Sequence, residues 1–82
     1  MSATYIIEAS YKGKPSKEID AAIRKAADKT EDGSGYSFPQ DRRDFTWTYE
    51  VKRYALAFCK RLKAAKIKGV TITLDEYKLE KV

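Results

Sequence analysis

Residues 33–49 read GSGYSFPQDRRDFTWTY, and this stretch decides the predicted fold. Residues 35–38 (GYSF) have the pattern of a short strand, residues 39–43 (PQDRR) that of a turn, and residues 44–51 (DFTWTYEV) alternate strictly. Pro39 has no N–H to give to a central ladder, which agrees with a turn at this point. We therefore predict a hairpin of two short strands in the middle of the chain.

One strand and one helix are predicted on each side of the hairpin. Residues 4–11 alternate as a strand, and residues 16–29 repeat apolar side chains at three- and four-residue spacing, as an amphipathic helix does. Residues 50–68 predict a second helix that ends at Gly69, and residues 70–77 alternate again. The core stripe expected for the second helix comprises Val51, Tyr54, Ala55, Phe58, Leu62 and Ala65.

The predicted order is therefore strand, helix, strand, strand, helix, strand. This is the split βαβ arrangement of the ferredoxin-like fold, an α+β domain in which two helices cover one face of a four-stranded antiparallel sheet. If GYSF forms no strand, the alternative is a three-stranded β-α-β-α-β sheet. A chain of 82 residues with 43% hydrophobic and 35% charged residues is expected to fold as a single domain over residues 1–82.

The charge balance favours anionic partners. There are 17 Lys and Arg residues against 12 Asp and Glu residues, which gives a formal net charge of +5. Cys59 is the single cysteine and cannot form an internal disulfide, and the N-terminal residues lack a basic start followed by a long apolar run. Because no apolar stretch approaches the roughly 20 residues that cross a bilayer, we expect a cytoplasmic protein without a membrane partner.

The absence of histidine and asparagine excludes several kinds of chemistry. Without histidine there is no His-based general acid or base and no His-containing zinc site, and one cysteine cannot supply a CxxC pair. Neither GxxxxGK[ST] nor GxGxxG occurs. The carboxylates near the glycines lack EF-hand spacing and lie beside two arginines that compete for them: Glu31, Asp32, Asp41 and Asp44. We therefore predict a non-enzymatic protein without a metal or cofactor.

Residues 43–49 (RDFTWTY) resemble in part the third-strand motif of RNA-recognition motifs, which share the ferredoxin-like topology. The resemblance implies base stacking on Phe45 and Trp47, although Asp44 stands where the motif has glycine. Outward-facing rings would turn Glu50 and the neighbouring threonines into the core and forfeit the burial of two aromatic side chains. We therefore expect both rings to face the core.

The opposite face of the sheet is then expected to be rich in threonine and somewhat acidic. Its residues are Thr4, Ile6, Glu8, Ser10, Thr46, Thr48, Glu50, Thr71, Thr73 and Asp75. Such a face repels phosphates, so the usual nucleic-acid platform of this fold is predicted to be disabled.

The second helix carries the first group of candidate partner-binding residues. The side chains expected opposite its core stripe are Lys52, Arg53, Leu56, Lys60, Lys63 and Ile67. In a docking face, the two apolar side chains supply burial and the cations steer an acidic partner. The alternative is an ordinary solvated helix face.

The hairpin tip carries the second group. Arg42 and Arg43 are expected to project there and to bind a phosphate or carboxylate bidentately, with Tyr36 nearby to orient the ligand. Alternatively, the two arginines pair with Asp41 and Asp44 or protect an edge strand against aggregation.

These observations predict a small, non-catalytic binding module that uses its basic helix face and hairpin tip on an acidic partner, either a nucleic acid backbone or an acidic protein surface. The alternative is a small phage-type inhibitor or accessory protein that occludes a host protein. An acylphosphatase-like enzyme would share the fold but relies on asparagine, which this chain lacks. We expect a monomer, or a dimer formed by pairing of an exposed edge strand at GYSF.

Overall fold

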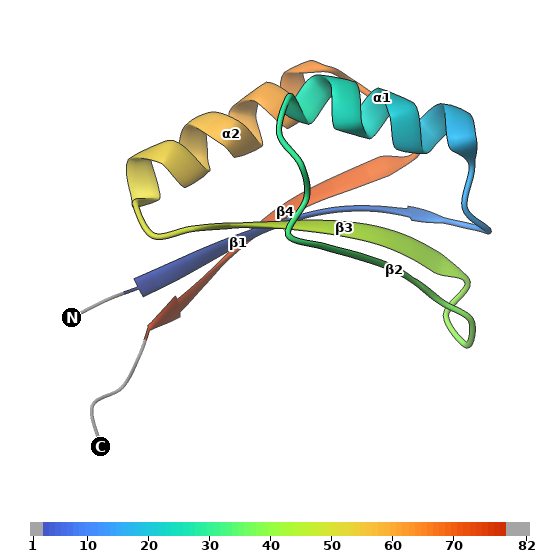
Figure 1. The fold of residues 1–82 in the computed structure, drawn as a ribbon, viewed down its shortest axis with the longest axis horizontal. Helices are drawn as coiled ribbons and strands as arrows, with labels where there is room; N and C mark the ends of the chain where they lie inside the picture. Colours follow the sequence, from blue (N-terminus) through green and yellow to red (C-terminus); the bar gives the residue numbers. More distant parts are fainter. Residues whose placement is uncertain (1–2, 79–82) are drawn as a thin grey trace.

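The computed structural model describes residues 3–78, which form one antiparallel sheet with two helices on one face (Figure 1). In chain order the elements are β1 (Ala3–Lys12), α1 (Lys17–Ala27), β2 (Gly33–Ser37), β3 (Arg42–Tyr49), α2 (Lys52–Ala64) and β4 (Val70–Lys78). The strand order is β2-β3-β1-β4, so β1 and β3 are central and β2 and β4 lie at the edges. The predicted ferredoxin-like arrangement is confirmed. The three-stranded alternative is wrong, because β2 pairs with β3.

Strand alternation directs the aromatic side chains of β3 toward the helices. In the β1–β3 register, Ala9 lies opposite Phe45 and Ile7 opposite Trp47. Both rings are 0% exposed, and the ring centroids of Trp47 and Phe58 on α2 are 5.1 Å apart. The expectation that these rings face the core is confirmed, and the base-stacking role implied by the resemblance to RNA-recognition motifs is wrong.

The other face of the sheet carries the threonines and carboxylates expected there. Glu8 on the central strand lies opposite Thr46 on β3 and Thr73 on β4, and Asp75 lies opposite Ile6. Because directly opposed residues of an antiparallel pair share a face, these polar side chains lie together on the side away from the helices.

The second helix is shorter than predicted at both ends. α2 begins at Lys52 and ends at Ala64, after which Lys66 (φ 50°) and Gly69 (φ 81°) adopt left-handed backbone conformations. Gly69 therefore belongs to the turn before β4 and does not end the helix. Between these two residues the chain turns back, and Ile67 packs against the core.

The core stripe predicted for α2 is correct only in its middle. Ala55, Phe58 and Leu62 are buried, whereas Val51 and Tyr54 are 43% and 53% exposed and Ala65 is also exposed. Cys59 is buried in their place. The helix meets the sheet only along this central stretch, so residues at its two ends leave the interface.

The other element boundaries shift by at most two residues. α1 begins after Ser16, whose Oγ accepts the Ile19 N–H at 3.4 Å, and it ends before Asp28, which has a left-handed conformation (φ 51°). β2 runs from Gly33 to Ser37 and so does not coincide with GYSF. Phe38 consequently belongs to the turn.

Candidate functional site

Arg43 belongs to a partly buried ion pair beneath α1. The hairpin turn occupies residues 38–41, and Arg43 is the second residue of β3. Its Nη2 lies 3.2 Å from Asp20 Oδ2, its Nη1 donates to the Gly35 carbonyl at 3.2 Å, and its guanidinium carbon lies 4.3 Å from the centroid of the Phe45 ring. The expectation of a free Arg43 at the hairpin tip is therefore wrong, because these neighbours occupy its donors.

Asp20 is the centre of this buried polar cluster. Its Oδ1 accepts the Tyr11 hydroxyl at 2.6 Å, and the Tyr11 oxygen in turn accepts the Ser16 N–H at 2.7 Å. Burial raises the pKa of Tyr11 above its ordinary value, and the hydrogen bond to Asp20 raises it further. Within residues 3–78, no buried side-chain nitrogen or oxygen lacks a hydrogen-bond partner. The cluster is therefore a structural link between α1, β1 and β3.

The hairpin tip presents an aromatic side chain where arginines were expected. Phe38 is 79% exposed, and its ring meets that of Tyr36 edge-on with centroids 6.5 Å apart. The Tyr36 hydroxyl donates to the Asp41 carboxylate, which raises the pKa of Tyr36. Sequence reasoning missed Phe38 because it assigned the residue to a strand. The signal that marks it is an aromatic residue directly before Pro39 in a turn.

Arg42 and Tyr36 do not form one site. Arg42 pairs across the hairpin with Ser37, whereas Tyr36 pairs with Arg43, so the side chains of Arg42 and Tyr36 lie on opposite faces of the sheet. Arg42 is exposed, and its Nη2 donates to Ser10 Oγ at 3.2 Å. The structure therefore separates Arg42 from Arg43 and Tyr36, which remain cross-strand neighbours on the helix-side face.

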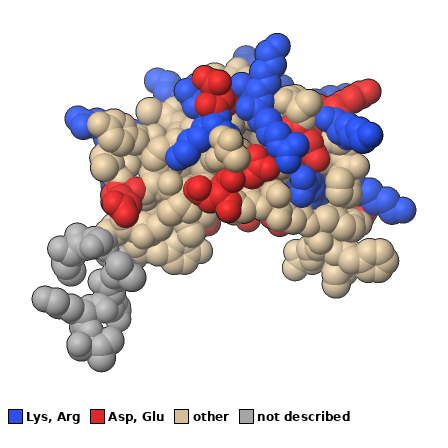
Figure 2. Space-filling model, viewed as in Figure 1, with Lys and Arg blue, Asp and Glu red and all other residues tan. Residues whose placement is uncertain are grey.

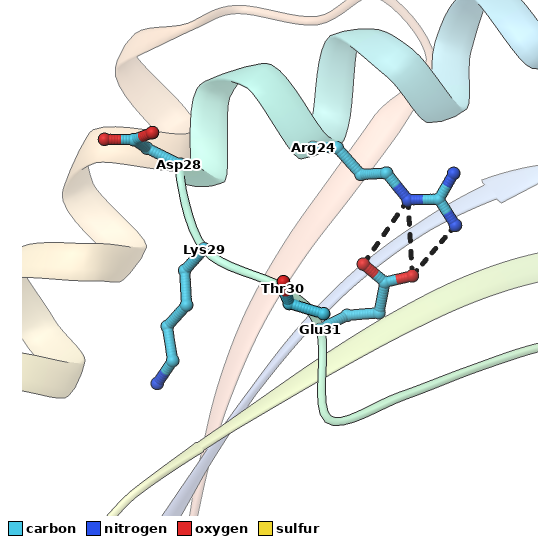
Figure 3. Close-up of a pocket in the computed structure, with 5 residues that line it drawn as sticks. All are labelled: Arg24, Asp28, Lys29, Thr30 and Glu31. Atoms are coloured by element: carbon cyan, nitrogen blue, oxygen red, sulfur yellow. Dashed lines mark hydrogen bonds and ion pairs between the residues drawn. The ribbon is translucent and has the colours of Figure 1, made fainter.

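A hollow of about 560 Å³ beside the end of α1 is lined by Arg24, Asp28, Lys29, Thr30 and Glu31 (Figure 3). The Nη2 and Nε of Arg24 lie 2.9 and 3.3 Å from Glu31 Oε2, and this pairing lowers the pKa of Glu31. In Figure 3, Asp28 and Lys29 point away from the pair. Lys29 Nζ lies over the Tyr49 ring, 4.0 Å from its centroid. The charged groups thus bind each other, contact this ring or face solvent, and they do not converge on a ligand.

The remaining carboxylates near the glycine-rich segment also lie apart from one another. Asp32 Oδ2 accepts the Thr48 N–H at 2.6 Å, Asp41 accepts the Tyr36 hydroxyl, and Asp44 lies on the open sheet face opposite Ser10. Among the described residues, no group of three or more His, Cys, Asp or Glu side chains is placed to hold a metal ion.

The exposed side of α2 retains most of its candidate residues. Lys52, Leu56, Lys60 and Lys63 follow one another at spacings of four and three residues and lie on one stripe, which we call the lysine stripe, and all four are exposed. Arg53 is exposed beside it and lies against the Tyr54 ring. In Figure 2, Lys and Arg side chains gather over the helices, while uncharged atoms cover much of the sheet side.

The cations of α2 form no ion pair with any other described side chain. Among the described side chains, the ion pairs are Arg24–Glu31 and Arg43–Asp20, and neither involves α2. Leu56 is 48% exposed in the middle of the lysine stripe. This is the arrangement of an apolar contact surrounded by unpaired positive charge.

Ile67 does not belong to this exposed face. It lies beyond the end of α2, is half-buried, and lines a smaller hollow of about 150 Å³ between α2 and β4. Its placement beside Leu56 was wrong because the prediction extended the helix to residue 68. Lys63 and Lys66 lie at this hollow together with Val70 and Ile72.

In comparisons with protein-family models, curated proteins and solved structures, the chain gave no match. Over the described part of the chain, neither helix has the length and apolar character needed to span a bilayer.

Proposed function

We propose that this chain is a non-catalytic binding module whose lysine stripe on α2 docks on an acidic surface of a partner protein. The observation that carries the proposal is Leu56, an apolar side chain 48% exposed among cations that form no ion pair within the described residues. Such an arrangement leaves apolar area in water and places like charges along one helix, which disfavours the isolated domain. A partner that covers Leu56 and supplies carboxylates removes both costs.

The apolar centre favours a protein over a nucleic acid. Backbone binding to DNA or RNA needs cations alone, and base binding on this fold uses exposed aromatic rings on the sheet. Here Phe45 and Trp47 are buried, and the open face carries Glu8 and Asp75. An acidic protein surface with an apolar depression uses both the cations and Leu56.

Charge reversal on the lysine stripe tests the proposal. The probes are a fluorescein-labelled copolymer of glutamate and leucine and a short labelled DNA duplex, with binding followed by fluorescence anisotropy. Lys52→Glu/Lys60→Glu is expected to weaken binding of the copolymer at least about tenfold, because two attractive contacts become repulsive. Leu56→Ser is expected to weaken it as well, since the copolymer then loses its apolar contact.

The matched control lies on α1. Lys17→Glu/Lys25→Glu changes the first and ninth residues of that helix, as Lys52→Glu/Lys60→Glu does in α2, and alters the net charge equally. This control is expected to change the affinity for the copolymer by no more than about twofold, because only the long-range effect of the lower net charge remains. Equal losses in the two variants would show non-specific attraction. If the protein binds the DNA duplex more tightly than the copolymer, and Leu56→Ser leaves the affinity for DNA unchanged, the result would favour the nucleic-acid alternative.

A further inference from the structure

A backbone hydrogen bond between β1 and β3 shows which residues of β4 direct their N–H and C=O groups toward β1 and which direct them away from the sheet. The Gly13 N–H donates to the Asp41 carbonyl at 2.7 Å, one step beyond the last β1–β3 pair. Backbone groups of an antiparallel strand point alternately to its two neighbours. The odd-numbered residues of β1 therefore bond to β3, and the even-numbered ones, such as Glu8 and Ser10, bond to β4. The backbone N–H and C=O groups of their partners Thr73 and Thr71 therefore point toward β1.

The even-numbered residues of β4 consequently direct their N–H and C=O groups away from the sheet. The first of them, Val70, donates its N–H to the Ile67 carbonyl at 3.2 Å, which agrees with this assignment. Ile72, Leu74 and Glu76 follow, and in the described chain no strand lies beyond them. These three residues, at every second position of β4, thus offer unpaired backbone groups along one edge.

The first half of this edge, from Val70 to Leu74, carries no charged residue, and the acidic residues Asp75 and Glu76 follow it. β4 pairs with β1 without interruption from Val70 to Lys78 and contains neither proline nor a bulge. β2, at the opposite edge, has five residues, of which two are glycine, and is followed closely by Pro39. The structure therefore favours β4 over the GYSF region as the edge that pairs with another chain.

A hollow for a side chain lies on the helix side of this edge. Its volume is about 150 Å³, comparable to an apolar cavity that holds a benzene ring, and its lining includes Leu62, Ile67, Val70 and Ile72. Side chains of an added strand alternate between the two faces of the sheet, so every second one would lie on the helix side. An apolar side chain at that position would fill the hollow.

The charges around the edge specify what else the added strand must carry. On the helix side, Lys63 and Lys66 line the hollow near the start of β4, and Glu76 lies on the same face near the end of the strand. The open side presents Thr71, Thr73 and Asp75. Acidic side chains therefore fit beside the hollow, and small uncharged ones fit on the open side. Pairing of β4 with a second copy would bring two lysine stripes together across the interface, which like-charge repulsion disfavours.

We propose that the free edge of β4 binds an extended acidic segment of the partner protein as a fifth strand. The segment places an apolar side chain in the hollow and carboxylates at Lys63 and Lys66, and it forms backbone hydrogen bonds to Ile72, Leu74 and Glu76. This inference rests on the proposed function, because it specifies how an acidic partner engages the side of α2 that carries the lysine stripe.

A synthetic peptide with alternating side chains tests the added strand. The probe is fluorescein-Thr-Glu-Thr-Leu-Thr-Glu-Thr-amide, labelled at its N-terminus, which places Glu, Leu and Glu on one face and threonines on the other. Two further peptides are N-methylated, one at Glu, Leu and Glu and the other at the internal threonines. Antiparallel addition bonds the residues that share the helix-side face with Ile72 and Leu74. Methylation of Glu, Leu and Glu is therefore expected to weaken binding at least tenfold, and threonine methylation to change it by less than threefold.

The outcomes separate this inference from the proposed function. Equal affinities of the two methylated peptides, or no binding of the parent peptide while the glutamate–leucine copolymer still binds, would overturn strand addition and leave the proposed function standing. If neither the peptide nor the copolymer binds the protein, both proposals would be overturned. Replacement of the peptide leucine by serine is expected to weaken binding at least threefold, and an unchanged affinity would exclude the hollow as the apolar contact.

Discussion

Asp20 shows where single-residue prediction from sequence fails. It is next to the apolar stripe of the first predicted helix, and its spacing is equally compatible with solvent exposure. The structure leaves it 8% exposed because Tyr11 on β1 and Arg43 on β3 supply its hydrogen bonds. These two residues are separated from Asp20 by 9 and 23 positions in the chain, so no local pattern reveals the cluster.

Tyr11→Phe is expected to lower the free energy of unfolding by about 1–2 kcal/mol at neutral pH, because it removes the donor to Asp20 and leaves a buried carboxylate oxygen less well paired. Urea denaturation followed by Trp47 fluorescence measures the change, since that ring is fully buried and reports unfolding. Tyr36→Phe is the control, because its hydroxyl lies at the turn where water can replace it. A loss from Tyr36→Phe as large as that from Tyr11→Phe would contradict the structural role of the Asp20 cluster.

The pH dependence of the same variant provides a second readout. The pKa of Tyr11 is raised in the folded state above its ordinary value of 10.0, by burial first and then by the bond to Asp20. The folded protein therefore holds this proton more tightly than the unfolded chain. The resulting stabilisation is complete below the unfolded pKa and is lost as pH rises through the folded pKa. We expect the difference between wild type and Tyr11→Phe to stay constant well below pH 10.0, the ordinary pKa of tyrosine, and to narrow as pH rises above it, and a difference that widens there would contradict this assignment.

At the scale of elements, the sequence predicted which side chains of a strand face the core better than it predicted where a helix ends. The placement of Phe45 and Trp47 followed from the burial of large rings against a polar opposite face, a preference of several kcal/mol. The end of α2 depended on contacts that the helix pattern does not contain. Ile67 packs against the core, and its carbonyl accepts the Val70 N–H, so the chain leaves the helix well before Gly69.

The start of α2 offers a direct test of helix capping. Val51 is the N-cap residue, with φ −109° and ψ 119°, but its side chain caps no backbone N–H, and the first turn contains no acidic residue. Val51→Asp is expected to raise the free energy of unfolding by about 1 kcal/mol, because the carboxylate bonds a free N–H and faces the positive end of the helix dipole. Val51→Ala is the control and is expected to give no gain. Urea denaturation compares the variants, and equal stabilities of the Asp and Ala variants would refute the capping account.

At the scale of the whole molecule, the structure separates two features that the sequence placed in one binding function. Figure 1 shows α2 and the β2–β3 turn at opposite ends of the domain. The lysine stripe could be predicted because helical spacing alone places Lys52, Leu56 and Lys60 together. The free edge of β4 and the hollow beside it could not, since they depend on strand order and on where α2 ends.

The lysine stripe also has a consequence for the stability of the domain. Its positive charges repel one another and, in the described residues, form no ion pair with a carboxylate. Lys52→Glu/Lys60→Glu is therefore expected to raise the free energy of unfolding by about 0.5–1 kcal/mol at low salt, and the gain should shrink as salt screens the charges. Lys17→Glu/Lys25→Glu should gain less, because the first turn of α1 already contains Glu18 and Asp20. Urea denaturation at low and high salt distinguishes the cases. A loss of stability in the α2 variant would mean that these lysines serve the fold, whereas a gain accompanied by weaker copolymer binding is expected of cations that are retained for a partner.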